Sequence, residues 1–390
     1  MRAVAGLLLL VIAAQGAEGL APAKAAEIEK LISEEMSRQG IPAVSVAVGS
    51  GGAMLWSAGY GLADVENYVP AKASTMYRLG SISKPITAVA AMQLAEAGKI
   101  DLDAPIDRYV AGFPRKRWPV TVRQLLGHLG GIRHYRNPAE INSTKHYDDL
   151  AATLRQFQED GLVAEPGTKY SYTTYGYVLL GLAVENASGV RFLDYLRTRI
   201  FRPAGMERIR DDHTFAIIPN RARGYVRVNG DLRNCALADT SNKIPGGGLA
   251  STAEDLIRFE LALESDRLLK PAARDSMYQR QRLRGGGTTA YGLGWSVARN
   301  DRRLVVFHTG GQQGVSTILK AIPRDRISVA LMCNLEKADL RPLSDRILRV
   351  LGGTGDAVKD SAGRRKWGGV AQPAAWAPRG LPGGTPSRPR

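Results

Sequence analysis

Segments with the pattern of β-strands lie near both ends of this 390-residue chain, and segments with helical periodicity fill the middle. The strand-like runs are residues 43–48 and 53–60 near the start, and 292–297, 304–308 and 327–333 near the end. The pattern predicts an α+β fold in which one antiparallel sheet, flanked by helices, is built from both ends of the chain and carries an inserted helical lobe. We expect the sheet lobe to comprise residues 22–80 and 230–351, and the helical lobe residues 81–229.

Helical periodicity and capping signals divide the chain further. Helices are predicted at 25–38, 82–97, 122–126, 177–185, 256–263 and 340–351. Gly98 is expected to end the second of these helices. The sequence Ser251-Thr252-Ala253-Glu254 is a capping box ahead of the fifth helix, and Asp339 is available as the N-cap of the last. The glycine-rich residues 49–52 predict a hairpin turn between the first two strands.

Composition excludes several classes of protein. Apolar residues make up 44% and charged residues 23%, values that are ordinary for a globular protein and unlike those of a disordered chain, a collagen-like fibre or a multispan membrane protein. The formal net charge is +16, but no basic stripe with interleaved aromatic residues accompanies it, so nucleic acid is not an expected partner. The positive charge is compatible with peptidoglycan or other anionic envelope polymers as partners. Two cysteines, Cys235 and Cys333, are too few for a disulfide scaffold and are predicted to be unpaired thiols.

Both termini have distinctive compositions. Arg2 is followed by twelve apolar or glycine residues at 3–14 and by small residues up to position 19, as in a secretory signal peptide. This stretch is too short to span a bilayer, so we expect residues 1–19 to be removed on export, leaving a periplasmic or secreted protein without a transmembrane anchor. An uncleaved anchor and a mitochondrial presequence are the alternatives, and the single arginine disfavours a presequence. Residues 352–390 contain nine glycines, five prolines and seven basic residues and are predicted to form a disordered tail.

A serine and a lysine at the start of the second predicted helix are the first candidates for chemistry. Ser81 and Lys84 are three residues apart in Gly80-Ser81-Ile82-Ser83-Lys84-Pro85, so a helix places them on one face. A serine hydroxyl needs a base to become a good nucleophile, and a lysine can be that base when burial or a nearby cation lowers its pKa. An N-cap serine beside a solvated lysine would have the same spacing.

Two further segments carry polar groups at the boundaries of predicted elements. Tyr172-Thr173-Thr174 lies in an aromatic-rich loop just before a helix, where a tyrosine can carry a proton. His308-Thr309-Gly310-Gly311 ends an apolar strand, and its glycines would let a ligand approach the backbone closely. Taken singly, these segments are also compatible with core packing and with an ordinary turn at the end of a strand.

In this order the three segments resemble the motifs of the penicillin-recognising serine hydrolases, which include class C β-lactamases, D-Ala-D-Ala carboxypeptidases and related esterases and peptidases. The resemblance extends over about residues 24–350 and includes the flanking stretches 59–64, 246–252 and 291–295. Residues 128–135, together with Tyr172-Thr173-Thr174, look like the mitochondrial serine β-lactamase-like proteins of animals and their bacterial relatives.

The resemblance implies a β-lactamase/DD-peptidase fold and a role for each motif residue. Ser81 would be the nucleophile, Lys84 and Tyr172 would share its proton, and the N–H groups of Ser81 and Gly311 would form the oxyanion hole. Substrate would be bound by Thr174, His308, Thr309 and Gly310. The family chemistry needs neither a cofactor nor a metal.

Function is predicted from these residues and from the absence of competing motifs. The sequence contains no Gly-x-Ser-x-Gly, His-Glu-x-x-His or Walker A motif. The family usually has Asn where this chain has Thr174, whose shorter hydroxyl offers less to a β-lactam side chain. We therefore expect an exported serine hydrolase that acts through an acyl-enzyme on a small-molecule or peptide substrate, with peptidase or esterase activity and weak β-lactamase activity. A true class C-type β-lactamase, a D-Ala-D-Ala carboxypeptidase, and a non-catalytic penicillin sensor or envelope scaffold remain alternatives.

Overall fold

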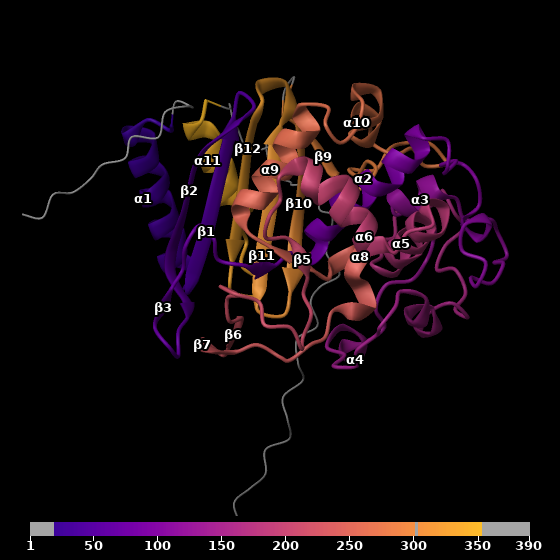
Figure 1. The fold of residues 1–390 in the computed structure, drawn as a ribbon, viewed down its shortest axis with the longest axis horizontal. Helices are drawn as coiled ribbons and strands as arrows, with labels where there is room; N and C mark the ends of the chain where they lie inside the picture. The colour runs from indigo at the N-terminus through magenta and orange to yellow at the C-terminus, as the bar shows by residue number, and fades with distance from the viewer. Residues whose placement is uncertain (1–18, 301–302, 353–390) are drawn as a thin grey trace, which may run out of the picture.

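A seven-stranded antiparallel sheet forms one side of the molecule, and most of the helices lie on the other (Figure 1). The computed structural model describes residues 19–300 and 303–352. The strand order is β3-β2-β1-β12-β11-β10-β9, so the first strands of the chain pair directly with the last one. The strands are β1 Ala43–Ser50, β2 Ala53–Asp64, β3 Val69–Pro70, β9 Ser296–Asn300, β10 Arg303–Gln312, β11 Val315–Ile322 and β12 Ile327–Cys333. The prediction of one antiparallel sheet built from both ends of the chain is confirmed.

Helices cover both faces of this sheet. The helices α1 (Pro22–Gln39) and α11 (Arg341–Val350) pack on one face, and α9 (Ala253–Glu264) packs on the other. Side chains alternate between the faces along β1, as expected for a strand. Val44, Val46 and Val48 belong to the core beneath α1 and α11, whereas Ala47 belongs to the core shared with α9 and the helical lobe.

Two almost fully buried helices form the centre of the helical lobe. They are α2 (Ser83–Glu96) and α5 (Tyr175–Ser188), which pack against each other and against the short α8 (Ile244–Gly247). A 3-10 turn over Gly80–Ile82 leads into α2 and packs against β10 and β11, so the sheet and the helical lobe meet at this turn.

Shorter elements complete the fold. The remaining α-helices are α3 Val122–Leu126, α4 Pro138–Ile141, α6 Phe192–Leu196, α7 Arg202–Ala204 and α10 Pro271–Met277. Two small sheets contain β4 Tyr77–Arg78, β8 Leu249–Ser251 and β5 Arg210–Asp211, and β6 Tyr225–Val228 and β7 Asp231–Asn234. Further single turns of helix span Ile106–Arg108, Ala151–Gln156, Arg197–Phe201, Ser241–Lys243 and Pro323–Asp325.

Local details differ from the sequence prediction in four places. The strand expected at 292–297 begins only at Ser296, and the central strand β11 was not predicted at all. The N-cap of α9 is Thr252 rather than Ser251, because the Thr252 hydroxyl accepts a hydrogen bond from the Asp255 N–H. Leu340 occupies the cap position of α11, while the Asp339 carboxylate accepts a hydrogen bond from the Arg341 N–H. Both shifts are one residue long, which is the usual uncertainty of helix boundaries.

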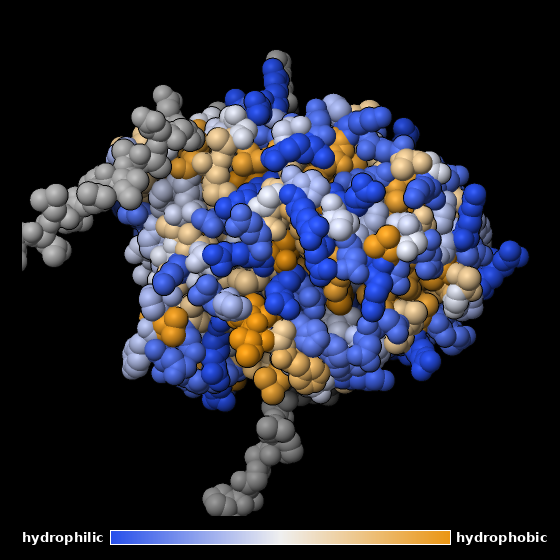
Figure 2. All heavy atoms as spheres, in the orientation of Figure 1, coloured by the Kyte–Doolittle hydropathy of each residue, from blue (hydrophilic) through white to orange (hydrophobic). Residues whose placement is uncertain are grey.

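The surface and the cysteines add little constraint on function. Hydrophilic residues cover most of the face shown in Figure 2, and the large exposed apolar side chains Phe215, Ile217 and Leu237 belong to the connections around β6 and β7. Cys235 and Cys333 are unpaired, as predicted. In residues 19–300 and 303–352, no helix has the length and hydropathy of a membrane span. The predicted signal peptide, apart from Gly19, and the predicted tail, apart from Gly352, lie outside the described residues.

Candidate active site

Ser81 lies in the 3-10 turn at which the chain enters α2. The preceding Gly80 has φ of +53°, a left-handed conformation that favours glycine. Ser81 is partly exposed, whereas Ser83 is fully buried and its hydroxyl donates to the Gly80 carbonyl at 2.9 Å. The turn therefore presents one serine to solvent and uses the other to stabilise itself.

Lys84 lies one helical turn beyond Ser81 and is fully buried. Its Nζ is 2.6 Å from the Gly246 carbonyl oxygen, 3.1 Å from Ser81 Oγ and 3.3 Å from Thr174 Oγ1. Burial lowers the pKa of Lys84 well below its ordinary value, and the charge of Lys243 lowers it further. A neutral amine has two N–H donors and one lone pair. When this amine donates to the Gly246 carbonyl and to the Thr174 hydroxyl, its lone pair is available to accept the Ser81 proton.

Tyr172 approaches Ser81 from the loop before α5. Its hydroxyl donates to Ser81 Oγ at 2.7 Å. The ring lies 4.3 Å, centroid to centroid, from the His128 ring, and His128 Nδ1 also accepts a hydrogen bond from the Thr173 N–H at 3.2 Å. Burial raises the pKa of Tyr172 above its ordinary value, so the hydroxyl keeps its proton at neutral pH. The structure thus places the Lys84 amine and the Tyr172 hydroxyl each within hydrogen-bond distance of Ser81 Oγ.

The end of β10 packs directly against the turn that carries Ser81. A Cβ on Gly80 would lie 2.8 Å from both the nitrogen and the carbonyl oxygen of Gly311, and a Cβ on Gly310 would lie 2.0 Å from the Leu79 carbonyl oxygen. Glycines at both positions are required for this close approach. Thr309 is partly exposed and Gly311 exposed, so this strand end offers a hydroxyl and a backbone beside Ser81.

The other two predicted substrate-binding side chains contact protein groups. The hydroxyl of Thr174, which is 4% exposed, accepts from Lys84 Nζ, and its backbone N–H donates to His134 Nδ1 at 3.2 Å. His308 is 3% exposed, and its Nδ1 is 2.7 Å from the Thr309 carbonyl oxygen while its Nε2 is 2.9 Å from the Tyr291 hydroxyl. Since a carbonyl only accepts, Nδ1 carries the proton and Nε2 accepts from Tyr291. Burial lowers the pKa of His308 to about 3, so the ring is uncharged at neutral pH. A role of Thr174, His308 and Gly310 in binding substrate stays a prediction.

Sequence reasoning missed several residues that complete this environment. Gly246, within the glycine-rich stretch before β8, supplies the carbonyl that binds Lys84. His128 and Tyr291 support Tyr172 and His308, and Lys243 supplies a nearby charge. A lone lysine or histidine in a sequence has no periodicity that marks it as buried, so only the family resemblance of the stretches 128–135, 246–252 and 291–295 pointed to His128, Gly246 and Tyr291.

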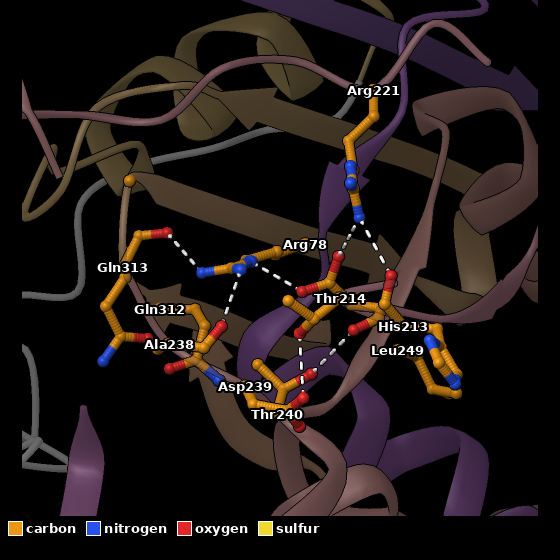
Figure 3. A network of polar contacts seen from close by, with 12 residues as sticks. Arg78, His213, Thr214, Arg221, Ala238, Asp239, Thr240, Leu249, Gln312 and Gln313 are labelled. Carbon is orange, nitrogen blue, oxygen red and sulfur yellow. Dashed lines mark hydrogen bonds and ion pairs between the residues drawn. The ribbon is translucent and has the colours of Figure 1, made fainter. Parts of the chain in front are cut away.

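A polar network lies behind the strand end. Figure 3 shows the Arg78 guanidinium between the backbone carbonyls of Gln313 and Ala238, to which it donates at 3.4 and 3.1 Å. Its Nε also donates to the buried Asp212 carboxylate at 2.7 Å. The network ties β4, the turn after β10 and the loop before α8 together, and thereby fixes the elements that carry Gly311 and Gly246.

An antiparallel sheet with an inserted helical lobe, and a serine–lysine–tyrosine cluster where the two meet, are the features of serine hydrolases of the penicillin-recognising class. In 19–300 and 303–352, no three His, Cys, Asp or Glu side chains are grouped so that they could hold a metal ion. The family model described as Beta-lactamase matches residues 28–353, and the chain belongs to that family. The family and fold predicted from the motifs are therefore confirmed.

The relatives of this chain include proteins with different names. The chain is 29% identical over 416 residues to the mitochondrial serine beta-lactamase-like protein LACTB of Homo sapiens, which covers 79% of this chain and 76% of the relative. It is 30% identical over 311 residues to penicillin-binding protein 4* of Bacillus subtilis (strain 168), covering 75% and 68%. Among solved structures, the octameric penicillin-binding protein homologue from Pyrococcus abyssi has a TM-score of 0.74 and 25% identity, covering 85% of this chain and 78% of that one. The D-amino acid amidase from Ochrobactrum anthropi SV3, complexed with L-phenylalanine amide, has a TM-score of 0.72 and 25% identity, covering 85% and 99%.

Proposed function

We propose that this protein is an exported hydrolase that cleaves ester or peptide bonds through an acyl-enzyme on Ser81 and has only weak β-lactamase activity. The observation that carries the proposal is the position of Ser81 Oγ, 2.7 Å from the Tyr172 hydroxyl and 3.1 Å from Lys84 Nζ. A partly exposed hydroxyl between a protonated tyrosine and a buried amine of lowered pKa has both a proton donor and a proton acceptor within reach.

The proposed reaction begins with attack by Ser81. The hydroxyl proton passes to Lys84 Nζ while Ser81 Oγ forms a bond to the substrate carbonyl carbon. The oxyanion would be stabilised by the N–H groups of Ser81 and Gly311. The bond to the leaving amine or alcohol then breaks, the Tyr172 hydroxyl gives its proton to the leaving group, and Lys84 returns a proton to Tyr172. Water repeats the sequence on the acyl ester, which releases a carboxylic acid and restores Ser81.

Two positions support an ester or peptide rather than a β-lactam as the preferred substrate. Thr174 has no amide to bind the acylamido group of a β-lactam, and its hydroxyl is already engaged with Lys84. His308 is uncharged and both of its ring nitrogens have protein partners, so this position offers no cation to a substrate carboxylate. Thr309 remains as the partly exposed hydroxyl of the strand end.

Export is proposed from the sequence of the first 19 residues alone. The 390-residue chain should be expressed in a bacterial host and the mature N-terminus determined by mass spectrometry of the periplasmic and membrane fractions. Processing after one of the small residues between positions 14 and 19 is the expected result. A product that keeps residues 1–19 in the membrane fraction would favour an uncleaved anchor.

A substrate panel tests the catalytic proposal. The rate constant kcat/KM should be measured for a p-nitrophenyl ester, a D-Ala-containing peptide and a chromogenic cephalosporin, together with labelling by a fluorophosphonate probe. We expect ester or peptide hydrolysis at least about tenfold faster than cephalosporin hydrolysis, and an adduct on Ser81. Ser81→Ala should abolish both turnover and labelling, whereas the matched change Ser171→Ala should preserve both.

Other outcomes would identify the alternatives. Cephalosporin hydrolysis near the diffusional range of about 10⁸ M⁻¹s⁻¹ would identify a true β-lactamase. Release of D-Ala alone would identify a carboxypeptidase. A stable penicillin adduct without any turnover would identify a sensor and contradict the proposal.

A further inference from the structure

A second buried lysine lies next to the proposed active site. Lys243 ends the turn Ser241–Lys243, just before α8, and is 1% exposed. Its Nζ donates to the Ile141 carbonyl oxygen at 2.8 Å and lies 5.2 Å from the centroid of the Tyr135 ring. Burial of an ammonium group without a direct carboxylate partner is costly, so its presence calls for a reason beyond packing.

The carboxylates in the neighbourhood of Lys243 are committed to other groups. Asp212 pairs with Arg78 and Arg221, and Asp239 binds the His146 ring and two further donors. The charges of Asp212 and Asp239 raise the pKa of Lys243 from a distance, whereas the positive charge of Arg78 lowers it. Throughout the part of the chain that the structure describes, no ion pair within 4.0 Å joins Lys243 to an acidic side chain. Figure 3 labels Arg78, Arg221 and Asp239 of this network.

Lys243 is connected to Lys84 through one short helix. The four residues of α8 follow Lys243 directly, and the third of them, Gly246, supplies the carbonyl that accepts from Lys84 Nζ at 2.6 Å. The charge of Lys243 also acts on Lys84 through space. The same turn of chain therefore sets both the position and the electrostatic surroundings of the Lys84 amine.

Other titratable groups face Lys84 but do not supply a charge. Burial lowers the pKa of His128, His134 and His308 below the ordinary value, so these three rings are neutral near pH 7. The rings of Tyr172 and Tyr177 lie 4.8 and 5.5 Å from Lys84 Nζ, and burial keeps both hydroxyls protonated. Among the residues that the structure describes, Lys243 is thus the cation whose charge lowers the pKa of Lys84.

We propose that Lys243 is a positioning residue whose ammonium charge holds the Lys84 amine in its proton-accepting form. The inference rests on the proposed function of Ser81 and Lys84. A lysine at position 308 would supply a positive charge to the site, whereas the neutral His308 does not. In this protein Lys243, the residue before α8, would supply that charge instead.

The expected effect depends on pH in a defined direction. Burial lowers the pKa of Lys243 to about 7, so its charge is present below that pH and is lost above it. A positive neighbour lowers the pKa of Lys84 and keeps it neutral at acidic pH, where it would otherwise take up a proton. Removal of the charge should therefore raise the pKa of Lys84 and move the acid limb of the activity profile toward higher pH.

The experiment compares Lys243→Gln and Lys243→Met with Lys243→Arg. Glutamine can still donate to the Ile141 carbonyl but carries no charge, methionine removes both features, and arginine keeps the charge. The same Lys→Gln change at the buried Lys320, whose Nζ contacts Asp345 beneath α11, is the matched control. For each folded variant, kcat/KM for a p-nitrophenyl ester and the second-order rate of Ser81 labelling by a fluorophosphonate are measured from pH 5 to 9.

We expect both neutral variants to shift the acid limb upward by at least about half a pH unit, which is about threefold in rate on that limb. The rates near pH 9 should stay within about threefold of wild type, and Lys243→Arg and Lys320→Gln should keep the wild-type limb. An unshifted limb in both neutral variants, or an equal loss at every pH, would overturn the inference while leaving the proposed function intact. Absence of labelling and turnover in the wild type would instead refute the proposed function.

Discussion

Gly80→Ala tests whether the contact between the Ser81 turn and the end of β10 organises the active site. Gly80 has φ of +53°, and a Cβ there would lie 2.8 Å from both the nitrogen and the carbonyl oxygen of Gly311. These are backbone atoms of a paired strand, so they cannot rotate away as a side chain would. The substitution must therefore strain the turn, displace the strand end, or both.

The size of each effect can be worked out from the structure. An alanine in the left-handed region costs roughly 1–2 kcal/mol of the free energy of unfolding. An increase of the 2.8 Å contact to an ordinary 3.4 Å needs a movement of about 0.6 Å between Gly80 and Gly311. Since a misplacement of 1 Å in a catalytic site can cost about 100-fold in rate, we expect kcat/KM to fall by about 10- to 100-fold.

Gly98→Ala is the matched control for this change. Gly98 has φ of +68°, so alanine introduces the same kind of strain, but a Cβ at this position would have no heavy atom within 4 Å. Both variants should lose similar stability in urea unfolding from the strain itself, and Gly98→Ala should retain wild-type kcat/KM for the p-nitrophenyl ester. The reasoning is refuted if Gly80→Ala keeps kcat/KM within threefold of wild type, or if Gly98→Ala loses as much activity.

Three other substitutions test the nucleophile and two buried titratable groups. Ser81→Ala should lower kcat by at least about 10³-fold. It should change the free energy of unfolding by less than about 1 kcal/mol, because the side chain is partly exposed. A smaller loss of kcat would indicate that another residue is the nucleophile. The pKa of His308 is about 3 in the folded protein and about 6.5 in the unfolded chain, so its contribution to stability is complete above pH 6.5 and is lost as the pH falls. Between pH 6.5 and 5 the free energy of unfolding should fall by about 2 kcal/mol, and urea titrations of His308→Gln should show a correspondingly flatter pH dependence. Burial and the neighbouring Glu264 raise the pKa of Glu260 to about 8, so the wild type should lose stability as the pH rises from about 4.5 to 8. Glu260→Gln should lose less stability between about pH 6 and 8.5. An equal loss in both proteins would show that the Glu260 carboxyl is ionised in the folded protein.

Some properties of this protein follow from local sequence. The short apolar runs at 43–48 and 327–333 predict strands, and their places near the two ends of the chain predict one sheet built from both ends. In the structure these two runs are β1 and β12, which pair directly. The separation of Ser81 and Lys84 by three residues places them on one side of the helix start, whatever surrounds them. Their motif order with Tyr172 and His308 was enough to identify the family.

Other properties were decided by tertiary packing. The strand β11 is buried along its whole length yet contains Ser316, Thr317 and Lys320, whose polar atoms are satisfied by Leu335, Leu79 and Asp345 from other elements. Its sequence alone therefore has neither the alternation of an exposed strand nor the apolar run of a buried one.

The protonation state of the site was also decided by packing. Whether Lys84 is charged depends on its burial, on the Gly246 carbonyl and on Lys243, which is 159 positions away in the sequence. The His308 Nε2 atom is likewise occupied by the hydroxyl of Tyr291, a residue from another segment of the chain, and this contact could not be read from the sequence. A pKa is set by the solvent and charges within a few ångströms of a group, and those neighbours are defined only when remote segments of the chain come together.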